Sequence, residues 1–285
     1  MAMRAYDAGR GYATDDCGRV PRAMAIIQVG VVSELWRYPV KSMRGERLRE
    51  MTVTAEGALG DRVYALRELK YGAIMSAKLW PWMLEMRAAW SAEPGASGAV
   101  VRVETPEGGV IQSDSPQSAE ILSDLFKHPV RLERTRQSPI SPADIEAIQK
   151  GEAFLPQWKF YDEGPLHLLA TGTLQHLSRL EGGAADFDPR RFRPNILIDT
   201  GDDAAEFIED RWLAGVLQIG QTVQIGDMWP AIRCVMTTHP QETLRHDPAV
   251  LHTAAQYHQA YVGVFAGARV AGAIKVGDPV MLATA

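Results

Sequence analysis

The sequence contains only two cysteines among its 285 residues, Cys17 and Cys234. Two cysteines cannot build a disulfide framework, so we expect a reducing compartment and predict a cytoplasmic protein. The sequence also lacks any apolar run close to the roughly 20 residues that span a bilayer. We therefore predict no association with a membrane.

An excess of positive charge is absent as well. The 30 lysines and arginines are outnumbered by 35 acidic residues, giving a formal charge of −5. This balance excludes the electrostatic footprint of a nucleic-acid-binding protein. The basic residues are instead grouped locally, at Arg37, Lys41 and Arg44 and again in 190–193. Such small groups suit a discrete anionic ligand better than a polyanion.

Several common catalytic motifs are missing. No glycine-rich phosphate loop and no Gly-x-Ser-x-Gly motif occurs in the sequence. Four histidines lie in the last fifth of the chain, but their spacing matches no zinc motif. On a helix, His252 and His258 would point to different faces. We therefore expect these histidines to be solvated helix residues and not metal ligands.

Short segments rich in β-branched residues predict many strands. Residues 26–36, 48–54 and 61–66 are three strand candidates with no helix between them, which favours antiparallel pairing. Helices are predicted to begin at Ser115-Pro116, Ser141-Pro142, Thr171 and Asp247-Pro248, where a hydroxyl or carboxylate can cap the first turn. Many short strands with a few helices are typical of a β-barrel with attached helical segments.

The chain divides into three predicted parts. Residues 1–24 mix charged residues with glycines and predict a flexible extension. Gly151 to Pro156 has the composition of a linker. We therefore expect an N-terminal region at 25–150 and a second domain at 151–285.

The stretch 229–238 carries the most reactive side chain of the sequence. It predicts a short apolar strand that contains Cys234 and runs into a polar turn at His239-Pro240-Gln241. Arg233 directly precedes the cysteine, and an adjacent cation favours the thiolate that acts as nucleophile or soft-metal ligand. A lone cysteine in an apolar strand can equally be an inert, buried small hydrophobe. The stretch by itself leaves both interpretations open.

Basic and polar turns elsewhere can complete a site around this thiol. They are Lys41-Ser42, Arg62, and Arg193 with Asn195. Together they would form a cationic pocket, in which arginine forks suit a phosphate and the thiolate suits a soft or high-valent metal. Individually, Lys41 can also be a solvated turn residue, Arg62 a surface strand residue, and Arg193 a partner for nearby acids such as Asp186 or Asp188.

Five blocks of sequence, in this order, resemble the MOSC family: 35–42, 60–62, 191–195, 233–238 and 274–280. They are most similar to two-part members with a MOSC N-terminal β-barrel region, the group that includes the mitochondrial amidoxime-reducing component. The resemblance implies a β-rich α+β fold. In that fold a MOSC β-barrel with attached helices is joined to a smaller N-terminal α/β subdomain, so 25–150 would be the MOSC N-terminal region and 151–285 the MOSC domain.

The resemblance also implies a cofactor. Members of this group bind the molybdenum cofactor, a pterin dithiolene that carries a phosphate, and the motif cysteine ligates molybdenum. Carried over, Cys234 would be the metal ligand. The cofactor-binding residues would be Lys41, Ser42, Arg62, Glu163, Gly164, Arg193, Asn195 and Arg233.

Relatives of this kind are molybdenum-dependent oxidoreductases that reduce N-oxygenated compounds such as amidoximes, hydroxylamines and N-oxides. With only two cysteines, the sequence has no cluster-binding domain of its own, so an external electron-transfer protein is implied. Where better-known members follow Thr-Thr with one residue and then Asp-Pro, this chain has His239-Pro240-Gln241. His239 is a candidate proton donor, because imidazole titrates near neutral pH, or else a turn residue facing solvent.

Two other functions remain open from the sequence. Cys234 could carry a persulfide and deliver sulfur to a partner, as MOSC domains fused to sulfurases suggest. The protein could also carry or store the molybdenum cofactor without catalysis. Glu163-Gly164, where the mitochondrial group has a Thr-Ser pair, places a carboxylate near the expected site and bears mainly on substrate identity.

Overall fold

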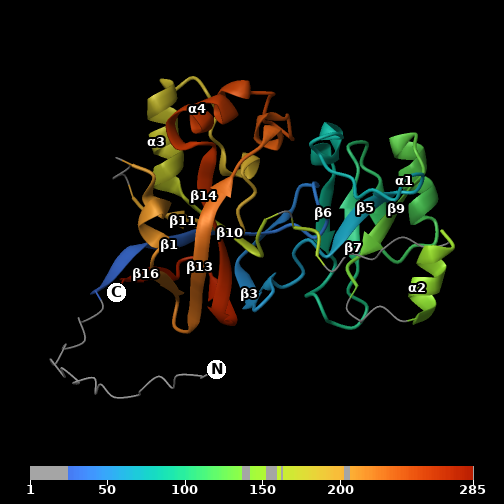
Figure 1. Cartoon of the computed structure of the whole chain (residues 1–285), viewed down its shortest axis with the longest axis horizontal. Helices are drawn as coiled ribbons and strands as arrows, with labels where there is room; N and C mark the ends of the chain where they lie inside the picture. The colour runs from blue at the N-terminus through green and yellow to red at the C-terminus, as the bar shows by residue number, and fades with distance from the viewer. Residues whose placement is uncertain (1–24, 137–141, 152–158, 162, 202–205, 285) are drawn as a thin grey trace, which may run out of the picture.

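The computed structural model describes residues 25–136, 142–151, 159–161, 163–201 and 206–284. The predicted extension 1–24 with Cys17, Ser141, and most of the predicted linker lie outside these residues. Two lobes lie side by side (Figure 1). The N-terminal lobe comprises 38–45 and 61–151, and the barrel lobe comprises the other described residues.

Within the described residues, seven strands close the barrel in the order β11-β10-β14-β13-β12-β16-β1, and β1 returns to β11. Neighbouring strands are antiparallel except the parallel pair β10 and β11. The strands are β1 (Ala25–Arg37), β10 (Leu166–Ala170), β11 (Ile196–Asp199), β12 (Val216–Ile219), β13 (Val223–Ile232), β14 (Tyr261–Val270) and β16 (Pro279–Thr284).

Closure depends on β1, which pairs with β16 along its first half and with β11 along its second. The pairing register shifts between Gln28 and Gly30 and again between Val32 and Glu34, and such irregularities bend a strand. A Cβ at Gly30 would lie 2.4 Å from the carbonyl oxygen of Asp199, so only glycine allows this close approach. The bend therefore lets one strand join both open edges of the sheet.

The barrel core draws on both halves of the sequence. Val32 and Leu35 of β1 pack with Leu166, Trp212 and Leu282 in one buried cluster. The short strands β2 (Glu46–Leu48), β3 (Glu50–Thr54), β4 (Gly57–Ala58) and β15 (Gly272–Lys275) extend this lobe. Residues 25–37 and 46–60 thus belong to the same lobe as the C-terminal part of the chain.

Two helices cover β10, β11 and β14. They are α3 (Thr171–Glu181) and α4 (Pro248–His258), which bury Leu177 and Val250 between them and the strands. As predicted, α4 begins at Asp247, whose Oδ1 accepts a hydrogen bond from Ala249 N at 3.0 Å. No helix in the described ranges is long and apolar enough to cross a membrane.

The N-terminal lobe has its own core, in which Met83, Leu84 and Met86 are buried. Its sheets pair β5 (Tyr64–Glu68) with β9 (Val130–Arg134), and β6 (Arg87–Trp90) with β7 (Val101–Glu104) and β8 (Val110–Gln112). Around them lie the 3-10 turn η1 (Pro81–Glu85) and the helices α1 (Ser118–Phe126) and α2 (Pro142–Gln149).

The predicted fold class, a β-rich α+β protein with a barrel and a smaller N-terminal subdomain, is confirmed. One predicted helix start was wrong, because the helix expected from Ser115 begins at Ser118. The antiparallel pairing expected of the three early strands is confirmed, although their partners are distant in sequence: β1 pairs with β16 and β11, β3 with β15, and β5 with β9.

Cys234 was predicted to lie within a strand and does not. Strand β13 ends at Ile232, and a 3-10 turn, η4 (Val235–Thr238), begins directly after the cysteine. The chain turns because the carbonyl of Cys234 accepts hydrogen bonds from Thr237 N at 3.1 Å and Thr237 Oγ1 at 3.0 Å. The thiol is therefore carried on a capped turn.

A buried acid in the barrel lobe gives a stability test. Glu209 lies in the 3-10 turn η3 (Ile208–Trp212), is 3% exposed, and accepts hydrogen bonds from Ala170 N at 2.8 Å and from Thr173 Oγ1. Burial raises its pKa from 4.5 to about 6. The folded state therefore binds this proton more tightly than the unfolded state does.

We expect the contribution of Glu209 to the free energy of unfolding to fall by about 2 kcal/mol as the pH rises from about 4.5 to about 6. Glu209→Gln removes this dependence while keeping a hydrogen-bonding side chain. Urea unfolding of both proteins at several pH values measures the difference. Parallel stability curves for the two proteins would contradict the assignment.

Candidate functional site

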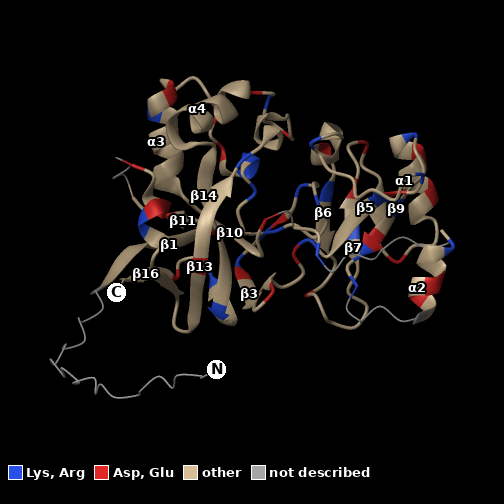
Figure 2. Cartoon of the chain, in the orientation of Figure 1, with Lys and Arg blue, Asp and Glu red and all other residues tan. Residues whose placement is uncertain are grey.

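A cleft between the lobes gathers the predicted site. Its lining includes every predicted site residue except His239: Lys41, Ser42, Arg62, Glu163, Gly164, Arg193, Asn195, Arg233 and Cys234. Lys41, Ser42 and Arg62 come from the N-terminal lobe, and the others come from the barrel lobe. Segments separated by up to 190 residues in sequence therefore meet in one place. Figure 2 shows both basic and acidic segments where the lobes meet.

Three of the lining residues have an unusual backbone. Ser42, Arg62 and Arg193 have φ angles of 65°, 49° and 56°, in the left-handed region that favours glycine. Such conformations cost about 1–3 kcal/mol each and persist where the surrounding structure enforces them, often at functional sites. Arg62 N, for example, donates to Tyr38 O at 2.7 Å. The residue types gave no signal of this strain.

Tyr38 is the platform for two of these arginines. The guanidinium carbons of Arg193 and Arg62 lie 4.2 Å and 5.0 Å from the centre of its ring. The tyrosine is 3% exposed, and its hydroxyl donates to Pro194 O at 3.2 Å. Burial raises the pKa of Tyr38 well above its ordinary value, so the phenol stays protonated. The ring fixes both guanidinium groups without neutralising them.

Arg193 is the most constrained cation of the cleft. It is 7% exposed, and its Nη1 donates to Met43 O at 2.6 Å. Its Nη2 is buried and has no hydrogen-bond partner among the described residues. Burial and the nearby charge of Arg62 lower the pKa of Arg193 to about 10. An anion bound in the cleft would satisfy this donor and relieve the repulsion.

The charges of the lining favour such an anion. Among the described residues it includes one carboxylate, that of Glu163, and these cations: Lys41, Arg62, Lys78, Arg191, Arg193 and Arg233. Some of this charge is used internally, since Arg62 pairs with Asp61 and Arg233 Nη2 donates to Phe192 O at 2.7 Å. The balance is still cationic, which suits a phosphate group.

Asn195 and Gly164 also have structural roles. Asn195 donates through Nδ2 to Trp36 O at 3.2 Å and accepts at Oδ1 from His167 N at 3.1 Å, so it joins β1 to β10. A Cβ at Gly164 would lie 2.7 Å from Phe265 Cβ and 2.8 Å from Trp229 Cζ2. Hydrogen bonding therefore requires an amide at position 195, and packing requires a glycine at position 164, independently of any ligand.

The thiol of Cys234 is half-buried and lines the cleft. The lining also includes the apolar side chains of Ile232, Met236 and Phe265. Ile232 is 53% exposed, and the neighbouring Val235 is 42% exposed. The described residues include no group of three or more His, Cys, Asp and Glu that could hold a metal ion. The cleft thus has a thiol beside apolar residues and a cationic part around Arg193.

His239 lies outside the lining. Its ring faces His246 with centroids 6.5 Å apart, and its Nε2 is buried without a hydrogen-bond partner among the described residues. Burial and the charge of His246 lower its pKa. The structure therefore does not bring His239 together with the other predicted residues, and its role as proton donor stays a prediction.

The sequence analysis missed two buried residues of the cleft. Arg191 is 2% exposed and donates to the carbonyls of Asp186, Thr237, His239 and Arg245. His167 also lines the cleft, and burial holds its pKa well below the ordinary value, so it is neutral at pH 7. Neither role could be inferred from residue type, because both depend on carbonyls contributed by distant segments.

Comparison with known families decides the identity of the fold. Residues 29–153 match the MOSC N-terminal beta barrel domain, and residues 156–281 match the MOSC domain. The chain belongs to the MOSC family. In three dimensions the boundary between the two matches does not separate the lobes, because residues of the first match form β1 to β4 of the barrel lobe.

Curated relatives cover most of the chain. Mitochondrial amidoxime-reducing component 1 of Homo sapiens is 27% identical over 92% of this chain and 85% of its own length. Mitochondrial amidoxime reducing component 2 of Rattus norvegicus is 25% identical, with coverage of 92% and 86%. A crystal structure of the YUAD protein from Bacillus subtilis superposes with a TM-score of 0.45 at 8% identity, covering 92% of this chain and 99% of that chain.

The packing of Gly164 gives a test at the site. We expect Gly164→Ala to lower the free energy of unfolding by about 1–3 kcal/mol, because its Cβ overlaps Phe265 and Trp229. Gly267→Ala is the matched control, since its Cβ would meet no atom closer than 4.0 Å. Chemical unfolding of the two variants measures the difference. Equal stabilities would show that Gly164 is not required by packing.

Proposed function

We propose that this protein is a molybdenum-cofactor-dependent oxidoreductase that reduces N-oxygenated compounds, with electrons from a separate electron-transfer protein. Membership of the MOSC family and the amidoxime-reducing relatives support a function associated with this cofactor. The observation that carries the proposal is one cleft lined by both Cys234 and Arg193, whose buried Nη2 has no hydrogen-bond partner among the described residues.

The described residues fit a ligand with a phosphate at one end and a thiophilic metal at the other. Arg193, Arg62, Lys41 and Ser42 would hold the phosphate, since they supply three cations and a hydroxyl of the lining. Cys234 would be the protein ligand of the metal. Arg233, Asn195 and the Glu163-Gly164 turn would contact the pterin between them.

When bound, the cofactor supplies the two-electron reduction of an N–O bond, which with two protons yields the reduced nitrogen compound and water. The chain orients the ligand, because Arg193 and Arg62 are held by Tyr38 and cannot follow a moving phosphate. Ile232, Met236 and Phe265 exclude water beside Cys234. Oxygen-transfer chemistry belongs to the cofactor, and positioning belongs to the protein.

The apolar residues beside Cys234 favour an uncharged organic substrate. Ile232 and Val235 flank the cysteine turn and are both strongly exposed. Exposed apolar side chains next to a reaction site supply binding energy for an apolar group of the substrate. Amidoximes and N-oxides carried on aromatic or aliphatic groups match this surface.

Replacement of Cys234 tests the proposal directly. In protein made in a host that synthesises the cofactor, we expect Cys234→Ser to lose molybdenum and at least about 100-fold in reduction of an amidoxime, because the metal loses its protein ligand. Cys17→Ser is the control and should retain both. Elemental analysis and a reductase assay with a chemical electron donor are the measurements.

Two outcomes would contradict the proposal. Bound molybdenum without reduction of any N-oxygenated compound would indicate a cofactor carrier. A Cys234 that is heavier by one sulfur atom, with the extra mass removed by a reductant and no molybdenum present, would indicate a sulfur carrier.

Ile232 tests the substrate preference. We expect Ile232→Ser to lower kcat/KM for an aromatic amidoxime by about 10-fold, because an apolar contact is lost. The kcat/KM for hydroxylamine itself should change little, since it has no apolar group. Ile121→Ser, an exposed isoleucine on α1 of the other lobe, is the control. Equal losses for both substrates would contradict a role of Ile232 in substrate selection.

A further inference from the structure

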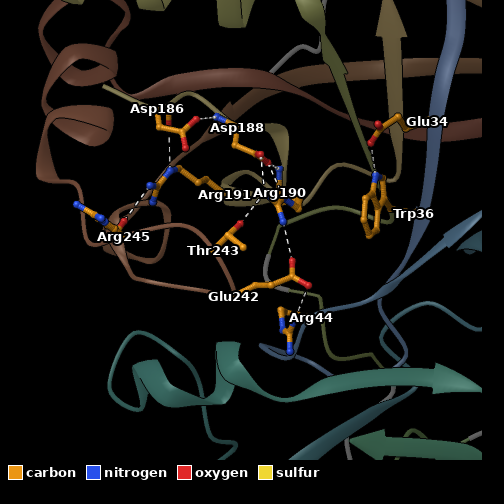
Figure 3. A network of polar contacts seen from close by, with 10 residues as sticks. All are labelled: Glu34, Trp36, Arg44, Asp186, Asp188, Arg190, Arg191, Glu242, Thr243 and Arg245. Atoms are coloured by element: carbon orange, nitrogen blue, oxygen red, sulfur yellow. Dashed lines mark hydrogen bonds and ion pairs between the residues drawn. The ribbon is translucent and has the colours of Figure 1, made fainter. Parts of the chain in front are cut away.

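Two segments carry much of the polar lining of the cleft. Residues 41–44 of the N-terminal lobe contribute Lys41 and Ser42, and residues 233–242 of the barrel lobe contribute Arg233 and Cys234. Beyond the cleft, both segments run to a common contact. The last residue of the first segment, Arg44, forms an ion pair with the last residue of the second, Glu242 (Figure 3).

Glu242 joins arginines of both lobes. Its Oε1 lies 2.9 Å from Arg44 Nη1, and its Oε2 lies 2.6 Å from Arg190 Nη1. Arg190 belongs to the 3-10 turn η2 (Pro189–Arg191) and pairs in addition with Asp188, at 2.8 Å between Nη2 and Oδ2. One carboxylate therefore bridges the two lobes (Figure 3).

On the N-terminal side the bridge has a firm base. The backbone of Arg44 joins the edge of β6, since its N donates to Met86 O and its carbonyl accepts from Ala88 N, both at 2.9 Å. Its Nη2 donates to Glu85 O at 2.9 Å. Because Arg44 is fixed to β6 by these hydrogen bonds, its ion pair connects Glu242 to the sheet of the N-terminal lobe.

On the barrel side the bridge is tied to the cysteine turn. Arg191 Nη1 lies 3.4 Å from both Thr237 O and His239 O, and its Nη2 donates to Arg245 O at 2.9 Å. Asp247 N donates to Thr238 O at 2.9 Å. These hydrogen bonds connect η4 to the loop that carries Glu242. A displacement of Glu242 would therefore also displace the turn that begins at Cys234.

We propose that Glu242 is a positioning residue, which holds the Cys234 turn against the N-terminal lobe and so sets the width of the cleft. Its backbone has a φ of 51°, a left-handed conformation that the surrounding contacts must maintain. The Glu242 and Arg44 side chains are 46% and 22% exposed, so salt screens their attraction. The inference rests on the proposed function only for the identity of the reaction, because the bridge itself needs no cofactor.

The test is the rate at which iodoacetamide alkylates Cys234 in cofactor-free protein that carries Cys17→Ser. In the parent protein, we expect the rate to rise between low and high sodium chloride, because screening weakens the bridge. Glu242→Gln should raise the rate at low salt by about threefold and remove most of the salt response. Circular dichroism melting verifies that each variant is folded.

A matched control is Asp227→Asn. Asp227 also has a left-handed backbone, at a φ of 49°, and pairs with Arg269 at 2.7 Å, but both residues lie on barrel strands away from the cleft lining. In the Asp227→Asn variant, iodoacetamide should alkylate Cys234 at the same rate as in the parent protein at every salt concentration. This variant controls for loss of an exposed carboxylate at a residue with a left-handed backbone.

Arg44→Gln separates positioning from a simple charge effect on the thiol. Loss of a positive charge by itself would slow alkylation, whereas an opened cleft speeds it, so we expect a faster rate. The double variant Arg44→Gln/Glu242→Gln should be no faster than the faster single variant, because both remove the same bridge.

The inference is overturned if Glu242→Gln keeps the parent rate and salt response, or if Arg44→Gln slows alkylation. It is also overturned if the rate increases of the two single variants multiply in the double variant. Because alkylation requires neither molybdenum nor substrate, it is independent of the proposed function. A protein that binds no molybdenum would refute the proposed function and leave the result for Glu242 standing.

Discussion

A buried guanidinium group connects the parts of this protein on which the site depends. Arg193 comes from the barrel lobe, but its Nη1 donates to Met43 O and its charge lies over Tyr38, both of the N-terminal lobe. Its remaining buried donor lacks a partner among the described residues, and burial lowers its pKa to about 10. The same side chain thus links the lobes and favours an anion in the cleft between them.

This arrangement depends on strand β1, which closes the barrel and leads directly into the residues of the cleft. Strand β1 pairs with β16 and β11 and ends at Arg37, and the chain continues directly through Tyr38 to Lys41 and Ser42. The strand that completes the barrel therefore also places the first residues of the cleft. Asn195 links the end of this strand to β10, so the barrel fixes the position of the chain where it enters the cleft.

The cleft lining combines two kinds of chemistry. It includes the cations Arg62, Arg193 and Lys41, and it includes Cys234 together with the apolar residues Ile232, Met236 and Phe265. The phosphate-bearing ligand that we propose would use both. The bridge from Glu242 to Arg44 and Arg190 spans the lobes outside this lining. In our proposals, ligand binding and control of cleft width are therefore assigned to different arginines.

The sequence by itself determined the residue types, their order and most local elements, including β10, α3 and the start of α4 at Asp247-Pro248. These follow from short-range periodicity and capping, which depend on neighbouring residues. Tertiary structure decided the turn at Cys234, the left-handed backbones at Arg62 and Arg193, and the place of His239 outside the cleft. It also decided that Glu242 meets Arg44, because such contacts join segments almost 200 residues apart and leave no local pattern.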